Sequence, residues 1–107
     1  MNITDIKTLA AKAHTNAAMS VTLDLEIAYE EFDKLAAQPI DHKATRKEAK
    51  AIAAEAAKGL PEAEQAAFIT DTYQAIKGHL VLNQLTEVLL PAGREDLIAP
   101  IAAVYSI

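Results

Sequence analysis

Alanine content constrains the fold of this chain more than any other feature. Alanine fills about a fifth of the 107 positions, whereas the chain has only three Gly and neither Cys nor Trp. Alanine is the best helix former because it loses no side-chain entropy on entering a helix, and glycine is among the poorest. The composition therefore predicts an almost entirely helical fold.

Length and charge indicate one globular domain spanning residues 1–107. About half of the residues are hydrophobic and 23% are charged, which is ordinary for a globular chain and too apolar for a disordered one. The net charge is −5, whereas a nucleic-acid binder normally has a basic surplus. We therefore expect no nucleic-acid partner.

The expected location is the cytoplasm. The absence of Cys excludes a disulfide framework and a thiolate metal site, and it agrees with a reducing compartment. Residues 1–5 lack the basic start of a signal peptide. The most apolar stretch, residues 80–90, is interrupted by Asn83, Gln84 and Glu87, so we expect no transmembrane segment.

The region from Thr4 to Ala37 follows a helical pattern, although residues 21–27 alternate as a strand would. No second strand-like run exists to pair with that segment, so helix is the better interpretation. Leu23 and Ile27 then form a second apolar line, which predicts burial on two sides or a subunit contact. A break within residues 15–20 would give two helices instead of one, and the sequence leaves both open. The apolar positions, at steps of three and four, are Ile6, Ala10, Ala13, Ala17, Val21, Leu25, Ala28, Phe32 and Leu35.

A second helix is predicted after Pro39, which disfavours helix at the residue before it. Thr45 and Glu48 have the spacing of a capping box, and Asp41 is the alternative N-cap. The helix runs to Lys58, and Gly59 is expected to end it in the left-handed conformation. One face carries the small or apolar residues Ala49, Ile52, Ala53 and Ala56.

A third helix is predicted to open at Pro61 and to be the most buried, because it is apolar on nearly all sides beyond His79. Gly78 and His79 are candidates for a bend. A loop over residues 90–93 leads to a last helix, with Pro100 in its first turns. These elements predict an all-α fold, a single-domain antiparallel bundle of four or five helices.

No metal or catalytic site is expected. The acidic group of residues 24–33 lacks the Glu-x-x-His pairs of di-metal bundles, so it is interpreted as a solvated face. His14, His42 and His79 are scattered, and no carboxylate lies one turn from His14 or His79 to orient the ring. We therefore predict a non-enzymatic protein without a cofactor. A phosphocarrier or enzyme that uses His79 is the less favoured alternative to a core histidine.

Two sets of residues are predicted to contact a partner. A stripe of lysines precedes a turn that resembles helix-turn-helix spacing, but the following helix begins with carboxylates where a recognition helix presents donors to bases. The stripe is therefore expected to contact an acidic protein surface or an anionic headgroup, or simply solvent. The last helix either closes the core or adds an apolar contact surface. The candidate residues are Lys43, Lys47, Lys50, Leu97, Ile101 and Tyr105.

The apolar spacing between Tyr73 and Tyr105, about a third of the chain, resembles a known family. The matching segments are Tyr73-x-x-Ile76, Leu80-Val81-Leu82-x-x-Leu85 and Leu97-Ile98-x-x-Ile101. They resemble the second half of the small immunity proteins that protect lactic-acid bacteria from pediocin-like bacteriocins, the enterocin A immunity group. The long stripe from Ile6 to Leu35 departs from that family's first helix.

The resemblance implies a cytoplasmic, non-enzymatic protector that recognises a membrane sugar transporter once a bacteriocin has engaged it. More generally, the sequence predicts a small protein-binding helical bundle. The alternative is a self-assembling accessory protein, a homodimer encoded by a phage or an operon, which the apolar segment of residues 21–27 motivates.

Overall fold

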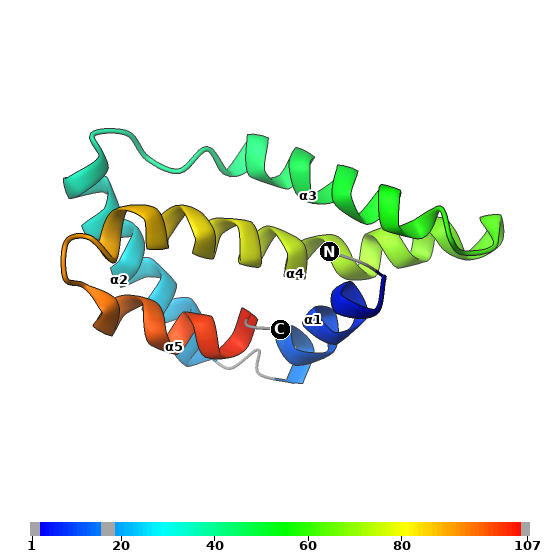
Figure 1. Cartoon of the computed structure of the whole chain (residues 1–107), viewed down its shortest axis with the longest axis horizontal. Helices are drawn as coiled ribbons and strands as arrows, with labels where there is room; N and C mark the ends of the chain where they lie inside the picture. Colours follow the sequence, from blue (N-terminus) through cyan, green and yellow to red (C-terminus); the bar gives the residue numbers. More distant parts are fainter. Residues whose placement is uncertain (1–2, 16–18, 106–107) are drawn as a thin grey trace.

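The computed structural model describes residues 3–15 and 19–105, with side chains described for residues 3–11 and 25–103. Within these residues the chain forms five helices and no strand, so the all-helical prediction is confirmed (Figure 1). The helices are α1 (Ile3–Thr15), α2 (Met19–Ala36), α3 (His42–Ala57), α4 (Glu62–Leu89) and α5 (Glu95–Tyr105). None of the described helices combines the length and the apolar character that crossing a membrane requires.

Helix α4 is the central element, as the sequence predicts. It has 28 residues and contacts each of the other four helices. Figure 1 shows α3 lying along one side of α4, with α2 and α5 on the other side. The helix continues through Gly78 and His79 without a break. The side chains in its first half and in its second half face different neighbouring helices.

The buried residues form two cores that meet along α4. The alanine-rich core joins α1, α3 and α4, and the aliphatic core joins α2, α4, α5 and Ile40, two residues before α3. The alanine-rich core contains Ile6, Leu9, Ala10, Ala49, Ala53, Ala57, Phe68, Ala75 and Ile76. The aliphatic core contains Ala28, Phe32, Ile40, Val81, Leu82, Leu85, Leu89, Ile98 and Ile101.

The first predicted segment is divided into α1 and α2, with residues 16–18 outside the description, so the two-helix alternative fits. Its apolar stripe is buried only in part. Phe32 is buried, but Leu35, in the last turn of α2, is 48% exposed because the chain turns away at Ala37. Ile27 is 43% exposed, so burial on two sides does not hold for this residue, and the alternative of a subunit contact stays a prediction; the side chain of Leu23 lies outside the described residues.

The N-cap of α3 lies four residues before Thr45, the first residue of the predicted capping box. The carboxylate of Asp41 accepts a hydrogen bond of 3.0 Å from the Ala44 amide, so Asp41 is the N-cap. Thr45 lies inside the helix and is buried, with its hydroxyl donating to the Asp41 carbonyl oxygen at 2.9 Å. The capping-box prediction for Thr45 and Glu48 is therefore wrong, and the Asp41 alternative is confirmed.

The predicted left-handed residue after α3 is also wrong. Among the described residues, a positive φ occurs only at Ala37 (63°) and Gly93 (77°), and not at Gly59. The Lys58 and Leu60 amides form 3.3 Å and 2.9 Å bonds to the carbonyl oxygens of Glu55 and Ala57, so α3 ends in tight right-handed turns. The glycine that ends a helix in the left-handed region is Gly93, after α4. The next amide, that of Arg94, donates to the Leu89 carbonyl oxygen at 2.9 Å.

Candidate functional site

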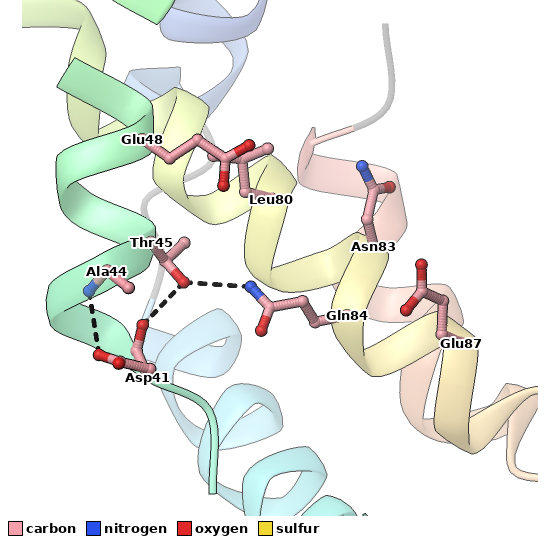
Figure 2. Close-up of a pocket in the computed structure, with 8 residues that line it drawn as sticks. All are labelled: Asp41, Ala44, Thr45, Glu48, Leu80, Asn83, Gln84 and Glu87. Carbon is pink, nitrogen blue, oxygen red and sulfur yellow. Dashed lines mark hydrogen bonds between the residues drawn. The ribbon is translucent and has the colours of Figure 1, made fainter. Parts of the chain in front are cut away.

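The candidate site is a groove between α3 and α4, formed by two adjoining hollows that share Leu80 and Asn83 in their walls. Figure 2 shows the residues that line the hollow near the start of α3. The hollow near the start of α3 has a volume of about 350 Å³, and the other has about 520 Å³. We call them together the acidic groove. Its lining residues are Asp41, Ala44, Thr45, Glu48, Ile52, Glu55 and Ala56 before the turn, and His79, Leu80, Asn83, Gln84 and Glu87 on α4.

Helical spacing brings these side chains to two facing flanks. Glu48, Ile52 and Glu55 follow one another at steps of four and three along α3, so they share one side of that helix. The same spacing places Leu80, Asn83 and Glu87 together on α4. Because α3 packs directly against α4, the two flanks become the walls of one groove.

Alanine sets the depth of the groove. Ala49, Ala53 and Ala57 are fully buried in the interface between α3 and α4. Such small side chains allow the two helices to approach closely, and the longer side chains on the flanks then extend past the interface. The groove therefore follows from the same alanine spacing that predicts the helix.

A hydrogen-bonded chain fixes α3 against α4 at one end of the groove. The Gln84 side-chain amide donates to the Thr45 hydroxyl at 3.1 Å, and that hydroxyl donates to the Asp41 carbonyl oxygen at 2.9 Å (Figure 2). Thr45 is only 4% exposed, and a buried hydroxyl without partners would be unfavourable. The chain therefore favours the observed register between the two helices.

The groove is negatively charged, and its floor is partly apolar. Asp41, Glu48, Glu55 and Glu87 line it, and no Lys or Arg does. Glu55 pairs with exposed Lys58 at 2.8 Å, whereas Glu48 and Glu87 form no ion pair in the described part of the chain. Such a surface fits a cationic group carried on an apolar stem. Across the described residues, no three potential metal ligands come together.

His79 lies on the wall of the groove and not in either core. It is half-buried and lines the wider hollow together with Glu55 and Asn83. We expected either a core histidine or one exposed at a bend in the helix. The exposure of His79 lies between these two, and α4 continues through it without a break. The same groove contains carboxylate and amide groups and the Thr45 hydroxyl.

The lysine stripe lies outside the groove. Lys43 and Lys47 are exposed on α3, and the Lys50 ammonium nitrogen lies 4.9 Å from the centre of the Tyr73 ring. This distance is typical of a cation–π contact. Lys50 therefore has a partner within the chain, whereas Lys43 and Lys47 face solvent.

The predicted residues of the last helix are divided between core and surface. Ile101 is fully buried in the aliphatic core, so it offers no surface to a partner in this conformation. Leu97 is half-buried and packs against the same core. The side chain of Tyr105 lies outside the described residues. Helix α5 packs on α1, α2 and α4 and not on α3, so the structure does not bring the lysines and the last helix together.

Sequence reasoning missed Glu48, Asn83 and Glu87 as site residues. A signal exists for two of them, because Asn83 and Glu87 are polar residues one turn apart in an otherwise apolar stretch. Glu48 was assigned only to a capping box. What joins the three is the packing of α3 on α4, which no local pattern specifies.

Comparison with known proteins gives no assignment: no protein-family model matches the sequence, and no curated protein or solved structure is significantly similar to it.

Proposed function

We propose that this protein is a small, non-enzymatic protein-binding module whose acidic groove holds a basic amphipathic segment of its partner. The observation that carries the proposal is an apolar floor at Ile52 and Leu80 flanked by Glu48 and Glu87, which form no ion pair among the described residues. Charges in such positions are available to cationic side chains of another chain.

The shape and charge of the groove define the partner chemistry. An apolar side chain of a partner segment would contact Leu80, and Lys or Arg residues one turn away would reach Glu48 and Glu87. Lys and Arg suit this surface because their aliphatic stems cover apolar floor while their charged ends meet the carboxylates. A short amphipathic helix laid into a groove is an established way to recognise a peptide.

The resemblance to bacteriocin immunity proteins supplies the most specific form of this proposal. In that form the protein acts in the cytoplasm, and the basic segment belongs to a membrane sugar transporter engaged by a bacteriocin. This form predicts that groove variants lose protection of bacteriocin-sensitive cells, whereas the general proposal requires only loss of peptide binding.

Peptide display followed by direct binding tests the proposal. Peptides selected on the wild-type protein should be enriched in Lys or Arg around an apolar residue, and their affinity should fall as salt is added. In Glu48→Gln/Glu87→Gln, affinity should fall at least tenfold, which corresponds to about 1.4 kcal/mol. The matched control is Glu26→Gln/Glu30→Gln, which changes two exposed carboxylates on α2 and should bind as the wild type does.

The location of binding is checked by amide chemical shifts. Titration with a selected peptide should move the resonances of Ile52, Leu80 and Asn83 first. Selection of peptides without basic residues, or equal affinity of the groove and control variants, would contradict the proposal.

Self-association is a second candidate, favoured by the exposure of Ile27 (43%) and Leu35 (48%) on α2. A contiguous apolar patch marks a contact surface, and Ile27 and Leu35 lie about two turns apart along the same helix. In this case sedimentation would show a homodimer, and Ile27→Lys/Leu35→Lys would convert it to a monomer. A wild-type chain that stays monomeric at high concentration would contradict this candidate.

A further inference from the structure

A further hollow, separate from the two that form the acidic groove, lies between α2 and α4 and shares no lining residue with that groove. Its volume is about 170 Å³. Lys77 and the side-chain amide of Gln74 supply polar groups, while Leu25 and Val81 are apolar. The remaining lining residues are Tyr29 and Gly78.

Two further basic residues on α3, His42 and Arg46, do not line the hollow but lie one turn apart on the same face of that helix. The His42 ring lies edge-on to the Tyr29 ring, with 5.1 Å between the ring centres and an angle of 78° between the planes. Because Tyr29 lines the hollow, His42 lies beside it. The Nδ1 atom of His42 is buried and has no hydrogen-bond partner among the described residues.

The basic groups are not neutralised within the described chain. Neither Arg46 nor Lys77 forms an ion pair there. Burial lowers the pKa of Lys77, and the charge of Arg46 lowers it further. Lys50, one turn after Arg46 on α3, contacts Tyr73, one turn before Lys77 on α4, so the same two helix flanks carry Arg46 and Lys77.

His42, on α3, is affected by the positive charges of the same two residues. Its pKa is lowered first by burial, then by Lys77 and Arg46, against the opposing charges of Asp41 and Asp33. The two carboxylates therefore do not fully offset the cations. An anion bound near Lys77 and Arg46 would favour the protonated imidazole.

We propose that this hollow, with Lys77, Arg46 and His42 around it, binds the phosphate group of a small soluble molecule. A guanidinium binds phosphate oxygens through two parallel hydrogen bonds, and a lysine adds a mobile positive charge. The Gln74 amide nitrogen donates to the Tyr73 hydroxyl at 2.8 Å, and its second N–H adds one further donor. Leu25 and Val81 can cover a short apolar stem. The volume is below the roughly 300–1,000 Å³ of pockets that enclose larger ligands, which favours a small phosphate compound.

The test is an NMR titration of the whole chain with inorganic phosphate at constant ionic strength, with sodium chloride as the reference salt. Phosphate should cause saturable shifts at Gln74, Lys77 and Gly78, and it should raise the pKa of the His42 imidazole. In Lys77→Gln and in Arg46→Gln, the dissociation constant should rise at least tenfold, the effect of losing a charge-assisted hydrogen bond.

Lys43→Gln/Lys47→Gln is the matched control, because it removes two exposed positive charges from α3 and should leave phosphate affinity unchanged. Circular dichroism establishes that each variant folds; if Lys77→Gln does not, the exposed Arg46→Gln decides the result. Shifts that do not saturate, or that chloride reproduces, would overturn the proposal. Equal affinity of the folded variants and the wild type would do the same. The groove variants Glu48→Gln/Glu87→Gln should bind phosphate normally, so this site and the peptide groove fail or succeed separately.

Discussion

The two cores are built from different side chains, although both lie against α4. Five of the nine buried residues in the alanine-rich core are alanines, against one of nine in the aliphatic core. Burial of apolar area contributes about 0.8 kcal/mol for each buried CH₂ group. The aliphatic core therefore contributes more stability per residue, whereas the alanine-rich core lets α3 lie close to α4. The aliphatic core thus supplies stability, while the alanine-rich core shapes the binding surface.

Removing a large side chain from the aliphatic core should produce the largest effect. Leu85 is fully buried there, and Leu85→Ala should lower the free energy of unfolding by about 2–5 kcal/mol through lost burial and a cavity. Urea unfolding followed by circular dichroism measures it. Leu90→Ala, at a residue 51% exposed, is the control and should change stability by less than about 0.5 kcal/mol. Similar losses of unfolding free energy in Leu85→Ala and Leu90→Ala would contradict this role of the aliphatic core.

Adding volume to the alanine-rich core should have the next largest effect. Ala53 is fully buried between α3 and α4, so Ala53→Leu should cost about 1–3 kcal/mol by overpacking. It should also force the helices apart and weaken peptide binding in the acidic groove. Ala54→Leu, at the exposed neighbouring position, tests whether burial is the cause. A stable Ala53→Leu variant with normal peptide affinity would contradict the close-approach argument.

Loss of the N-cap of α3 should have a smaller effect. Asp41→Ala removes the carboxylate that accepts from the Ala44 amide, which should cost about 1 kcal/mol. Asp41→Asn keeps a side-chain oxygen acceptor and should retain most of the stability. Thermal unfolding of both variants separates capping from charge. An equal loss in the two would show that the negative charge matters more than the hydrogen bond.

The pH dependence of His42 should give the smallest effect. Its pKa lies below the ordinary 6.5, chiefly through burial and then through Lys77 and Arg46. Above pH 6.5 the imidazole is neutral in both states. As the pH falls below 6.5, the unfolded chain binds a proton more readily, so stability declines until the pH passes the lowered pKa of the folded state. His42→Gln should show a shallower decline between pH 6.5 and 5 in phosphate-free buffer, and an unchanged slope would contradict the assignment.

Most helices were predictable because their signals are local. Alanine content, apolar spacing and the prolines near residues 39, 61 and 91 located the helical regions of the fold. The errors arose where two local signals were both reasonable. Asp41 and Thr45 are each good caps, and only the packing of Thr45 against Gln84 on α4 distinguishes them. Likewise Gly59 and Gly93 are both suited to the left-handed region, but only Gly93 is used.

The candidate site was not predictable from the sequence. Glu48 and Glu87 are far apart in the chain and become neighbouring walls only when α3 packs along α4. The lysines are conspicuous because they cluster in sequence, yet Lys50 contacts Tyr73 and Lys43 and Lys47 face solvent. A cluster in sequence marks a helix face, whereas a groove depends on which two faces meet.

The continuity of α4 has a consequence for folding. A single unbroken helix runs through both cores, from Phe68 in one to Leu89 in the other. Neither core can therefore open completely without exposing part of the helix on which the other is built. The backbone amides between Ile76 and Leu85 should exchange with solvent only when the whole molecule unfolds, whereas those near the ends of α3 should exchange through local fraying. We therefore expect the two differently built cores to unfold as one cooperative unit.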